Sequence, residues 1–350
     1  MKNQLVIYGA TGYTGKLMVE MAAAQGLKPL ISGRNEQKLS ELGEQFGLDH
    51  RTVSLDDEDG LSALLADAQL VLHIAGPFSA TAQPMVKACL ATKTHYLDIT
   101  GEIEIFEHHY TLNSAAKEAG IMIMSGVGFD VVPTDCLAAH LKNRLADASQ
   151  LEISIAAGGA LSPGTAKTGV ESIHKKTIVR RGGQLNELGK ALFSRTDFGR
   201  GERPTIAMSW GDVSTAYRTT GIPDITVYFK LSTAIKKIMS IPGWVRSLMG
   251  NSIVQRIVKW QIEKRISGPT AEQRAATTSS IVAEATNANG EKARSILTTP
   301  EGYTLTCMTS LEIVARVMQG DAQPGFQTPA GLFGADFILP FEGVERKDVA

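Results

Sequence analysis

Three glycines near the start of the chain have the spacing of a phosphate-binding turn. The segment Gly9-Ala-Thr-Gly12-Tyr-Thr-Gly15 follows an apolar run at residues 4–8 and precedes a helical pattern at residues 13–25. Gly9 permits a tight turn, Gly12 lets backbone N–H groups approach a pyrophosphate at the helix start, and Gly15 lets helix and strand pack closely. Because the commoner spacing is G-x-G-x-x-G, the alternative is a tight turn without a ligand. We predict dinucleotide binding by Gly9, Thr11, Gly12, Tyr13, Thr14 and Gly15.

The second predicted strand ends in Ser32, Gly33, Arg34 and Asn35. An NAD site usually places an acidic residue here to hold the ribose hydroxyls. The guanidinium of Arg34 instead suits a 2′-phosphate, to which it can donate charge-assisted hydrogen bonds, and Lys38 lies one turn into the next helix. The alternative is that Arg34 is a solvated surface residue. We predict NADP(H) rather than NAD(H) as the cofactor, with Ser32, Arg34 and Asn35 near its adenosine half.

A glycine-proline turn ends the fourth predicted strand, as Ala75-Gly76-Pro77-Phe78. Ligands of open α/β sheets bind outside the carboxyl ends of the strands. We therefore expect Ala75, Gly76, Pro77 and Phe78 to lie beside the middle or the nicotinamide half of the cofactor. The alternative for Phe78 is a buried side chain behind a structural turn.

Two carboxylates follow neighbouring predicted strands and are candidates for moving a proton. Asp98 lies near the end of the strand predicted at residues 94–99, and Asp130 follows the strand and glycine turn at residues 121–128. Groups at adjacent strand ends can orient a substrate or shuttle a proton. Asp98 has the alternative role of capping the following turn. His174 is the third catalytic candidate, although a lone histidine on a helix is more often structural or solvated.

Other catalytic patterns are missing from the sequence. No tyrosine has a lysine four residues later, which argues against the Tyr-x-x-x-Lys mechanism of short-chain dehydrogenases. The adjacent His108 and His109 do not share a helical face, so we predict no metal site. Lys167 and Tyr217 are weaker candidates for the proton donor.

Strands alternate with helices over roughly the first 150 residues, which predicts crossover units and a parallel sheet. Beyond that point, residues 204–212 and 224–231 alternate like antiparallel strands, residues 163–179 resemble a helix, and Asn289-Gly290 predicts a hairpin. The expected fold class is α/β, with an N-terminal Rossmann domain and an inserted α+β domain whose sheet is mainly antiparallel. The expected limits are 1–148 for the Rossmann domain, 149–310 for the α+β domain, and 311–350 for a C-terminal segment that returns to the Rossmann domain.

Composition restricts the classes of function and compartment. The 350 residues include 35 Lys+Arg and 36 Asp+Glu, so the formal net charge of −1 gives no field that attracts nucleic acid. The three cysteines, Cys89, Cys136 and Cys307, form no C-x-x-C pair, which fits a reducing compartment. We found no signal-peptide pattern and no apolar stretch long enough for a membrane span, and we expect a cytoplasmic protein.

Residues 230–265 are basic and apolar, with Glu263 as the only acidic residue. Such a segment can lie on anionic lipid or cover a greasy substrate. It can equally be a core-facing amphipathic pair of helices with solvated lysines. A homodimer is the default expectation for a soluble enzyme.

Several motifs together resemble the saccharopine dehydrogenase-like oxidoreductase family, which includes saccharopine reductases and trans-acting enoyl reductases. These motifs are GATGYTG at 9–15, IAGPF at 74–78, YLDITGE at 96–102, GFDVVPTD at 128–135, GTAKT at 164–168, WGDVSTAYRTTGIPDITVYF at 210–229 and GFQTPAGLFG at 325–334. The chain has Val131 where family members often have serine. Taken together, the motifs that carry the resemblance extend over most of the chain, from residue 9 to residue 334.

The resemblance implies a Rossmann domain, an inserted substrate domain and NADP(H) or NAD(H) as redox partner. It also points to a set of residues around the cleft: Asp98, Thr100, Gly101, Glu102, Phe129, Asp130, Pro133 and Asp135. An early helix position is the alternative explanation for Asp135. We expect hydride transfer between NADP(H) and a C=C, C=N or C=O bond of an unidentified, hydrophobic substrate. The alternative is a non-catalytic NADP(H)-binding sensor or scaffold.

Overall fold

The computed structural model describes residues 2–233, 235–236, 240–242, 245 and 248–349. The chain forms two compact units. The first consists of Met1–Val132 and Tyr303–Leu332, and the second of Pro133–Gly302 and Phe333–Ala350. Each unit is described by itself below.

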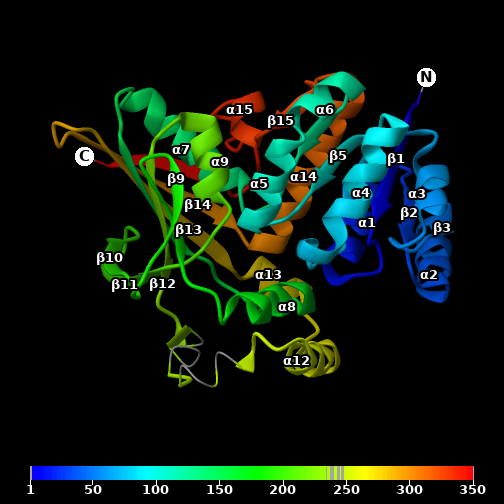
Figure 1. The fold of residues 1–350 in the computed structure, drawn as a ribbon, viewed down its shortest axis with the longest axis horizontal. Helices are drawn as coiled ribbons and strands as arrows, with labels where there is room; N and C mark the ends of the chain where they lie inside the picture. Colours follow the sequence, from blue (N-terminus) through cyan, green and yellow to red (C-terminus); the bar gives the residue numbers. More distant parts are fainter. Residues whose placement is uncertain (1, 234, 237–239, 243–244, 246–247, 350) are drawn as a thin grey trace. The chain divides into compact units, whose positions relative to one another are not determined.

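A parallel sheet forms the centre of the first unit. In the described part of the chain it has seven strands in the order β3-β2-β1-β4-β5-β6-β15, and each neighbouring pair is parallel. Among these strands, Figure 1 labels β1, β2, β3, β5 and β15. The first six positions are the Rossmann order. The strands are β1 (Gln4–Tyr8), β2 (Leu30–Gly33), β3 (His50–Thr52), β4 (Ala68–His73), β5 (His95–Asp98), β6 (Met122–Met124) and β15 (Gly325–Gln327).

Helices connect these strands as crossover units. They are α1 (Tyr13–Ala24), α2 (Glu36–Phe46), α3 (Glu58–Leu65), α4 (Phe78–Thr92), α5 (Ile103–Thr111), α6 (Asn113–Ala119), α14 (Gly302–Gln319) and α15 (Pro329–Phe333). The two ends of helix α2 are set by local capping interactions. The side chain of Asn35 accepts a hydrogen bond from the N–H of Lys38, and Gly47 ends the helix in the left-handed conformation at φ 64°.

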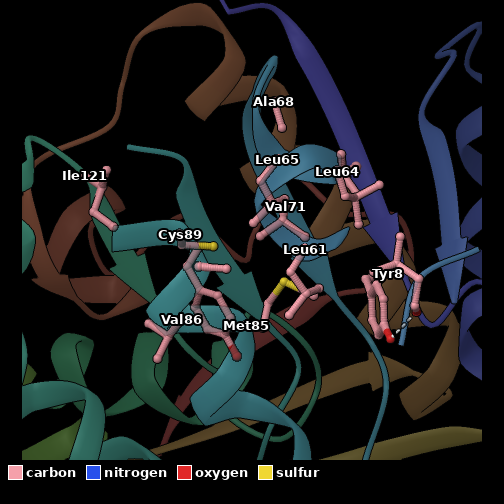
Figure 2. Packing of buried hydrophobic residues seen from close by; sticks show 14 of the residues in the cluster. Tyr8, Leu61, Leu64, Leu65, Ala68, Val71, Met85, Val86, Cys89 and Ile121 are labelled. Atoms are coloured by element: carbon pink, nitrogen blue, oxygen red, sulfur yellow. Dashed lines mark hydrogen bonds between the residues drawn. The ribbon is translucent and has the colours of Figure 1, made fainter. Parts of the chain in front are cut away.

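One face of this sheet packs on α3 and α4 to form a hydrophobic core (Figure 2). Leu61, Leu64 and Leu65 come from α3, while Met85, Val86 and Cys89 come from α4. They cover Val71 and Tyr96, which lie opposite each other on β4 and β5. Burying these apolar surfaces is the main force that holds the helices on the sheet.

The same face changes character at the carboxyl ends of the strands. The register places Ser32, Tyr8, His73 and Asp98 in one row across β2, β1, β4 and β5. All four side chains are buried. Since buried polar groups are costly unless they are satisfied, this row marks the edge of the sheet as chemically distinct from the apolar core.

The second unit contains a mixed sheet that is mainly antiparallel. Among the described residues its main path runs β10-β11-β12-β7-β13-β14-β16, and only the β12–β7 pair is parallel. The predicted hairpin is confirmed, because β13 and β14 pair on either side of Gly290, whose φ is 82°. The strands are β7 (Gln150–Ala156), β8 (Ile178–Arg181), β9 (Gln184–Glu187), β10 (Phe193–Asp197), β11 (Glu202–Ala207), β12 (Asp224–Lys230), β13 (Thr278–Thr286), β14 (Lys292–Pro300) and β16 (Glu345–Val349).

The predicted fold class is therefore confirmed: a parallel Rossmann sheet in one unit and a second, mainly antiparallel sheet inserted between its two segments. The helices of the second unit are α7 (Val132–Arg144), α8 (Pro163–Ser172), α9 (Asp212–Thr220), α12 (Ser252–Arg265) and α13 (Ala271–Ala275). The segment expected to be helical at residues 163–179 is shorter than predicted. Helix α8 ends at Ser172, because Ile178 and Val179 pair in β8 with β9.

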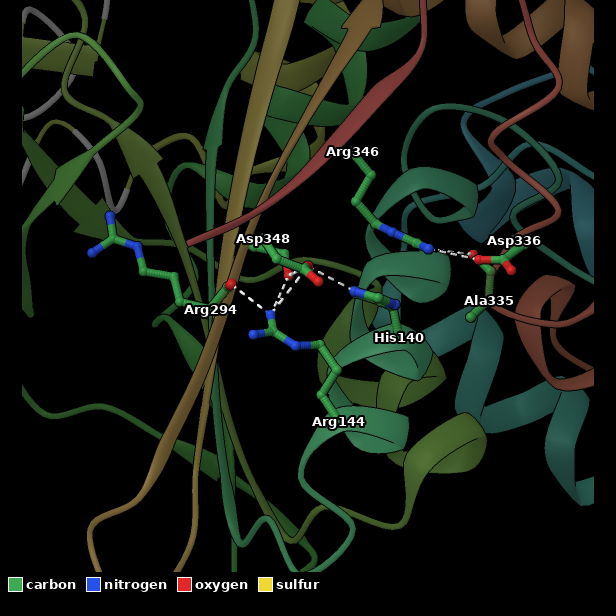
Figure 3. Close-up of polar contacts among 8 residues, drawn as sticks. His140, Arg144, Arg294, Ala335, Asp336, Arg346 and Asp348 are labelled. Carbon is green, nitrogen blue, oxygen red and sulfur yellow. Dashed lines mark hydrogen bonds and ion pairs between the residues drawn. The ribbon is translucent and has the colours of Figure 1, made fainter. Parts of the chain in front are cut away.

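Polar contacts hold the last strand to the second unit (Figure 3). Asp348 on β16 accepts hydrogen bonds from His140 at 2.8 Å and Ser295 at 2.6 Å, and Arg144 lies 3.1 Å from the same carboxylate oxygen. These partners come from α7 and β14. Strand β16 is thereby tied to two elements distant in sequence.

The C-terminal segment divides between the two units. Strand β15 pairs with β6, whereas β16 pairs with β14, and the units change over at residues 132/133, 302/303 and 332/333. The limits expected from the sequence were 148/149 and 310/311. As limits of domains that fold independently, those expected positions stay a prediction.

The basic segment at residues 230–265 is only partly described. Strand β12 ends at Lys230 and α12 begins at Ser252, while Lys237 and Arg246 lie outside the described residues. Within the described ranges, no helix has the length and apolar character needed to cross a membrane.

Candidate functional site

The glycine turn after β1 is fastened to the end of β2. The N–H groups of Gly9 and Ala10 donate to the carbonyl oxygen of Ser32, at 2.8 and 3.2 Å, and the N–H of Gly12 donates to the carbonyl of Gly9 at 3.1 Å. Helix α1 begins immediately afterwards, with Gly12 as its N-cap and no side-chain capping hydrogen bond. The start of α1 is thus held rigidly at the carboxyl edge of the sheet.

Two of the three glycines are required by the fold itself. A Cβ at Gly9 would lie 2.7 Å from the backbone nitrogen of Ala75, and the φ of 90° also disfavours any other residue. A Cβ at Gly15 would lie 2.3 Å from the carbonyl oxygen of Gly9. By contrast, a Cβ at Gly12 would meet no atom closer than 3.4 Å, and Gly12 is exposed. Packing within the protein therefore does not require a glycine at position 12, where the chain forms the N-cap of α1.

Ala10 is buried in the turn, and three further residues of the turn are half-buried. They are Thr11, Tyr13 and Thr14, and the ring of Tyr13 packs edge-on against Tyr303 of α14, with the centroids 5.0 Å apart. Since Tyr303 belongs to the C-terminal part of the first unit, α14 also contributes to the surroundings of the glycine turn.

The segment that follows β2 presents an exposed cation, Arg34, and a carboxylate, Glu36, that is bound to other side chains of the protein. Arg34 is exposed, and among the described residues it forms no ion pair. The nearest acidic residue in sequence, Glu36, already binds the side chains of His50, at 3.1 Å, and Thr52. The hydrogen bond from Thr52, with that from His50, lowers the pKa of Glu36, so this carboxylate is committed to its protein donors. Ser32 is buried, and its hydroxyl donates to the carbonyl of Arg51 at 2.7 Å.

The Ala75–Phe78 turn leads into α4, whose first N–H groups are capped by a distant side chain. Glu102 accepts from the N–H of Phe78 at 2.9 Å and from the N–H of Ser79 at 2.7 Å. Pro77 at the N-cap provides no capping side chain. A carboxylate at a helix N-terminus satisfies unpaired donors and interacts favourably with the helix dipole. The structure therefore gives Glu102, which the resemblance placed at the cleft, a capping role.

Asp98 is the centre of a buried hydrogen-bond network. Its Oδ1 accepts from the N–H groups of Thr100 and Gly126, both at 3.0 Å, and its Oδ2 accepts from the hydroxyl of Ser125 at 3.0 Å. The imidazole Nδ1 of His109 lies 2.7 Å from the same hydroxyl. Asp98 is 0% exposed, so these contacts join the loops after β5 and β6 rather than reaching solvent.

Burial and hydrogen bonding act on the pKa of Asp98 in opposite directions. Burial raises it, while the N–H groups of Thr100 and Gly126 lower it, and the balance brings the pKa to about 6. Burial also lowers the pKa of His109 to about 3, so this ring is neutral at physiological pH. The network therefore contains a carboxyl with a raised pKa and an uncharged imidazole.

Asp130 is more accessible than Asp98. It is half-buried, follows the turn after β6, and lies so close to Gly101 that a Cβ there would be 2.8 Å from its Oδ2. Burial and then the negative charge of Glu102 raise the pKa of Asp130 to about 7. A carboxyl that is partly protonated near neutral pH suits a general acid.

His73 is a site residue that the sequence analysis missed. It ends β4 between Tyr8 and Asp98 in the polar row, is 0% exposed, and has no hydrogen-bond partner for either ring nitrogen among the described residues. Phe78 covers its ring edge-on at 5.5 Å. The signal in the sequence was a histidine in the apolar run QLVLHIAG, at a position where that face of the strand should be apolar.

The remaining predicted residues lie in other surroundings. His174 is exposed, belongs to the second unit and follows the end of α8. Asp135, in the first turn of α7 beside Pro133, is buried and accepts from Thr219 at 2.6 Å. Within the first unit, the N–H of Phe129 donates to the hydroxyl of Thr306 at 3.0 Å.

The weaker proton-donor candidates both have protein partners within the second unit. Lys167 forms an ion pair with Glu263, and the ring of Tyr217 lies 4.3 Å from the guanidinium carbon of Arg180. In the part of the chain that the structure describes, no three histidine, cysteine or acidic side chains gather as metal ligands.

Comparisons with known proteins agree with this geometry. The family model described as the saccharopine dehydrogenase NADP binding domain matches residues 5–124. The chain is 31% identical over 162 residues to a saccharopine dehydrogenase-like oxidoreductase of Rattus norvegicus, covering 41% of this chain and 38% of the rat protein. It is 32% identical over 148 residues to a trans-acting enoyl reductase of Mycobacterium bovis, covering 40% of this chain and 35% of that protein. The matches thus span little more than a third of the length of these relatives.

A solved structure resembles the chain over almost its whole length. This is the apo saccharopine dehydrogenase (L-Glu forming) of Saccharomyces cerevisiae, with a TM-score of 0.67, 12% identity, and coverage of 99% of this chain and 100% of that one. At this identity the likeness concerns the fold, which includes both sheets.

Proposed function

We propose that the chain is an NADP(H)-dependent oxidoreductase, because residues 5–124 match the family model described as the saccharopine dehydrogenase NADP binding domain. It transfers a hydride between NADP(H) and a C=C, C=N or C=O bond of a substrate. The observation that carries this proposal is the glycine turn after β1, in which only Gly12 has no packing explanation within the protein.

The residues at the carboxyl edge fit the cofactor in charge and in space. The pyrophosphate would bind at the turn formed by Gly9–Gly15, where α1 begins without a side-chain cap. The 2′-phosphate would bind Arg34, which is exposed, with Lys38 and Asn35 close by in sequence. Ser32 supports the turn through its carbonyl oxygen, and the Ala75–Phe78 turn would face the nicotinamide half. When bound, the cofactor supplies the hydride, and the protein binds and orients it.

Calorimetric titration with NADPH and NADH tests this assignment. Removing the 2′-phosphate contact in Arg34→Ala should weaken NADPH about tenfold to a hundredfold and leave NADH unchanged, because a hydrogen bond to a charged group contributes about 1.5–3 kcal/mol. Arg203→Ala, which removes an exposed arginine from the second unit, is the matched control and should bind like the wild type. Failure to bind either nucleotide would refute the cofactor assignment.

We assign different roles to the two carboxylates of the first unit. Asp130 is the proposed proton donor, because it is half-buried and its pKa of about 7 keeps part of the population protonated. Asp98 is a proposed positioning residue, because its oxygens accept hydrogen bonds from the loops that follow β5 and β6. His174 stays a prediction as a further catalytic residue on the second unit.

The substrate class is the least restricted part of the proposal. The names of the relatives refer to saccharopine dehydrogenase-like oxidoreductases and to a trans-acting enoyl reductase, and we propose a hydrophobic substrate for this chain. Oxidation of NADPH in the presence of enoyl, imine and carbonyl compounds tests the reaction. Tight NADPH binding without turnover of any of these classes would favour the alternative, a sensor or scaffold that binds the cofactor.

We also propose a reducing compartment, the cytoplasm, and a homodimeric state. The compartment is supported by Cys89, Cys136 and Cys307, which are buried free thiols. Cell fractionation tests the location, and light scattering coupled to gel filtration tests the oligomeric state.

A further inference from the structure

Helix α12 of the second unit has an apolar stripe that faces solvent. Ile253, Ile257 and Trp260 have the spacing i, i+4, i+7, which places them on one face of a helix. Their exposed fractions are 64%, 53% and 57%. Large apolar side chains clustered on one exposed face mark an interaction surface more often than single exposed residues do.

Cationic side chains border the same stripe. Arg256, Lys264 and Arg265 are exposed, and the ammonium of Lys264 lies 4.0 Å from the ring centroid of Trp260. On a helical projection, residues 256 and 264 lie within one residue step of the apolar stripe. The exposed face of α12 therefore combines apolar and positively charged groups.

Ion pairs on another side of α12 hold the helix to α8. Lys259 pairs with Glu171, and Glu263 pairs with Lys167, so the acidic side chain of α12 is engaged by a lysine of α8. These contacts orient α12 by its polar side. Ile253, Ile257 and Trp260 stay exposed beside these ion pairs.

We propose that this face of α12 docks on an anionic lipid surface. A helix with aliphatic and tryptophan side chains on one face and arginine or lysine beside them can lie in the membrane interface, with its apolar side among the acyl chains. The positive border complements anionic headgroups. It argues against a second copy of this chain as the occupant, because two such faces would bring like charges together.

Vesicle flotation of the full chain, without cofactor or substrate, tests the proposal. The probes are vesicles of phosphatidylcholine alone and of phosphatidylcholine mixed with phosphatidylglycerol. We expect flotation with the anionic vesicles, weaker or no flotation with the neutral ones, and loss of binding at high salt. Because no nucleotide is present, failure here is distinguishable from failure of the cofactor titration.

Paired variants separate the apolar and charged contributions. Ile257→Ser with Trp260→Ser should lower the partition coefficient on anionic vesicles at least about tenfold, because the buried apolar area is lost. Arg256→Gln with Lys264→Gln should lower it roughly twentyfold on anionic vesicles and leave neutral vesicles unaffected. Phe193→Ser, at a side chain of the second unit that is 54% exposed on β10, is the control and should float like the wild type.

Tryptophan fluorescence reports whether Trp260 itself enters the lipid. A blue shift is expected on adding anionic vesicles, and Trp260→Phe should keep the binding while losing that part of the shift. Flotation with neither vesicle type, or equal flotation of wild type and variants, would overturn the proposal. A third outcome would also overturn the proposal: the wild type is a dimer in gel filtration, Trp260→Ser is a monomer, and neither protein binds vesicles. The stripe would then be an interface between copies of the chain.

Discussion

Replacing His73 by phenylalanine should change how the stability of the first unit depends on pH. The ring is fully buried among Tyr8, Phe78 and Tyr96, and neither nitrogen has a hydrogen-bond partner in the described structure. Burial, and to a smaller extent the charge of His109, lowers the pKa of His73 to about 3 from the ordinary value of 6.5. The folded protein therefore carries this imidazole in its neutral form.

The sign follows from proton binding. Between the folded pKa of about 3 and the unfolded value of 6.5, the unfolded chain binds a proton that the folded chain does not. Above the unfolded pKa this residue does not lower the free energy of unfolding. Below it, the free energy of unfolding decreases by about 1.4 kcal/mol for each pH unit, down to the folded pKa. At about pH 5 the loss is roughly 2 kcal/mol. His73→Phe removes this pH dependence. The free energy of unfolding of the variant minus that of the wild type should therefore be roughly 2 kcal/mol larger at about pH 5 than at about pH 7.5.

Hydrogen exchange of peptides from β4 and β5 measures this difference. It reports the opening free energy of the first unit alone, which avoids treating a chain of two units as a two-state system. Phe78→Leu is the control, because it alters packing on the same ring without removing a titratable group. If the opening free energy of His73→Phe differs from that of the wild type by the same amount at both pH values, the reasoning is refuted. His73 would then titrate alike in the folded and the unfolded chain.

Two further predictions concern the glycine turn and Asp130. Gly15→Ala should destabilise the first unit by about 1–3 kcal/mol, because its Cβ meets the carbonyl of Gly9. Gly12→Ala should lower the free energy of unfolding by about 1 kcal/mol or less, yet weaken NADPH binding at least about tenfold. Thermal unfolding and calorimetry measure the two effects, and equal losses of stability in the two variants would contradict the ligand role of Gly12. Asp130→Asn should lower kcat about a hundredfold or more while the affinity for NADPH stays unchanged. Wild-type turnover should fall as the pH rises above about 7, where the carboxyl of Asp130 loses its proton. If the variant turns over at the wild-type rate, Asp130 is not the proton donor.

Local sequence signals predicted the elements that depend on local physics. The glycine turn, the buried strand before it and the hairpin at Asn289-Gly290 were all predicted, because each depends on backbone conformations or apolar periodicity visible in a short window. The helix at residues 163–179 was overextended, since the β-branched residues Thr177, Ile178 and Val179 were read as helical. Pairing of β8 with β9 and β12 decides that segment, and such pairing is not visible locally.

The site depended on contacts between distant residues, which a single sequence does not reveal. Glu102 looked like a cleft residue because of its motif, yet it caps α4 through N–H groups at Phe78 and Ser79, more than twenty positions earlier. The histidine within the apolar run QLVLHIAG is a local signal that position 73 is unusual, but it does not indicate that Tyr8 and Asp98 will flank it. Only the order of the strands brings these side chains into one row.

The acidic groups along this edge explain how an anionic cofactor can be accommodated beside them. Glu36 binds His50 and Thr52, Glu102 binds the start of α4, and Asp98 is enclosed by its own hydrogen-bond donors. Each of these carboxylates is directed toward protein groups, and the raised pKa of Asp130 reduces the charge of the fourth near neutral pH. Arg34 is exposed and forms no ion pair among the described residues. These contacts and charges support the proposal that a phosphate-bearing ligand binds at Gly12 and Arg34 and that Asp130 exchanges a proton with the substrate.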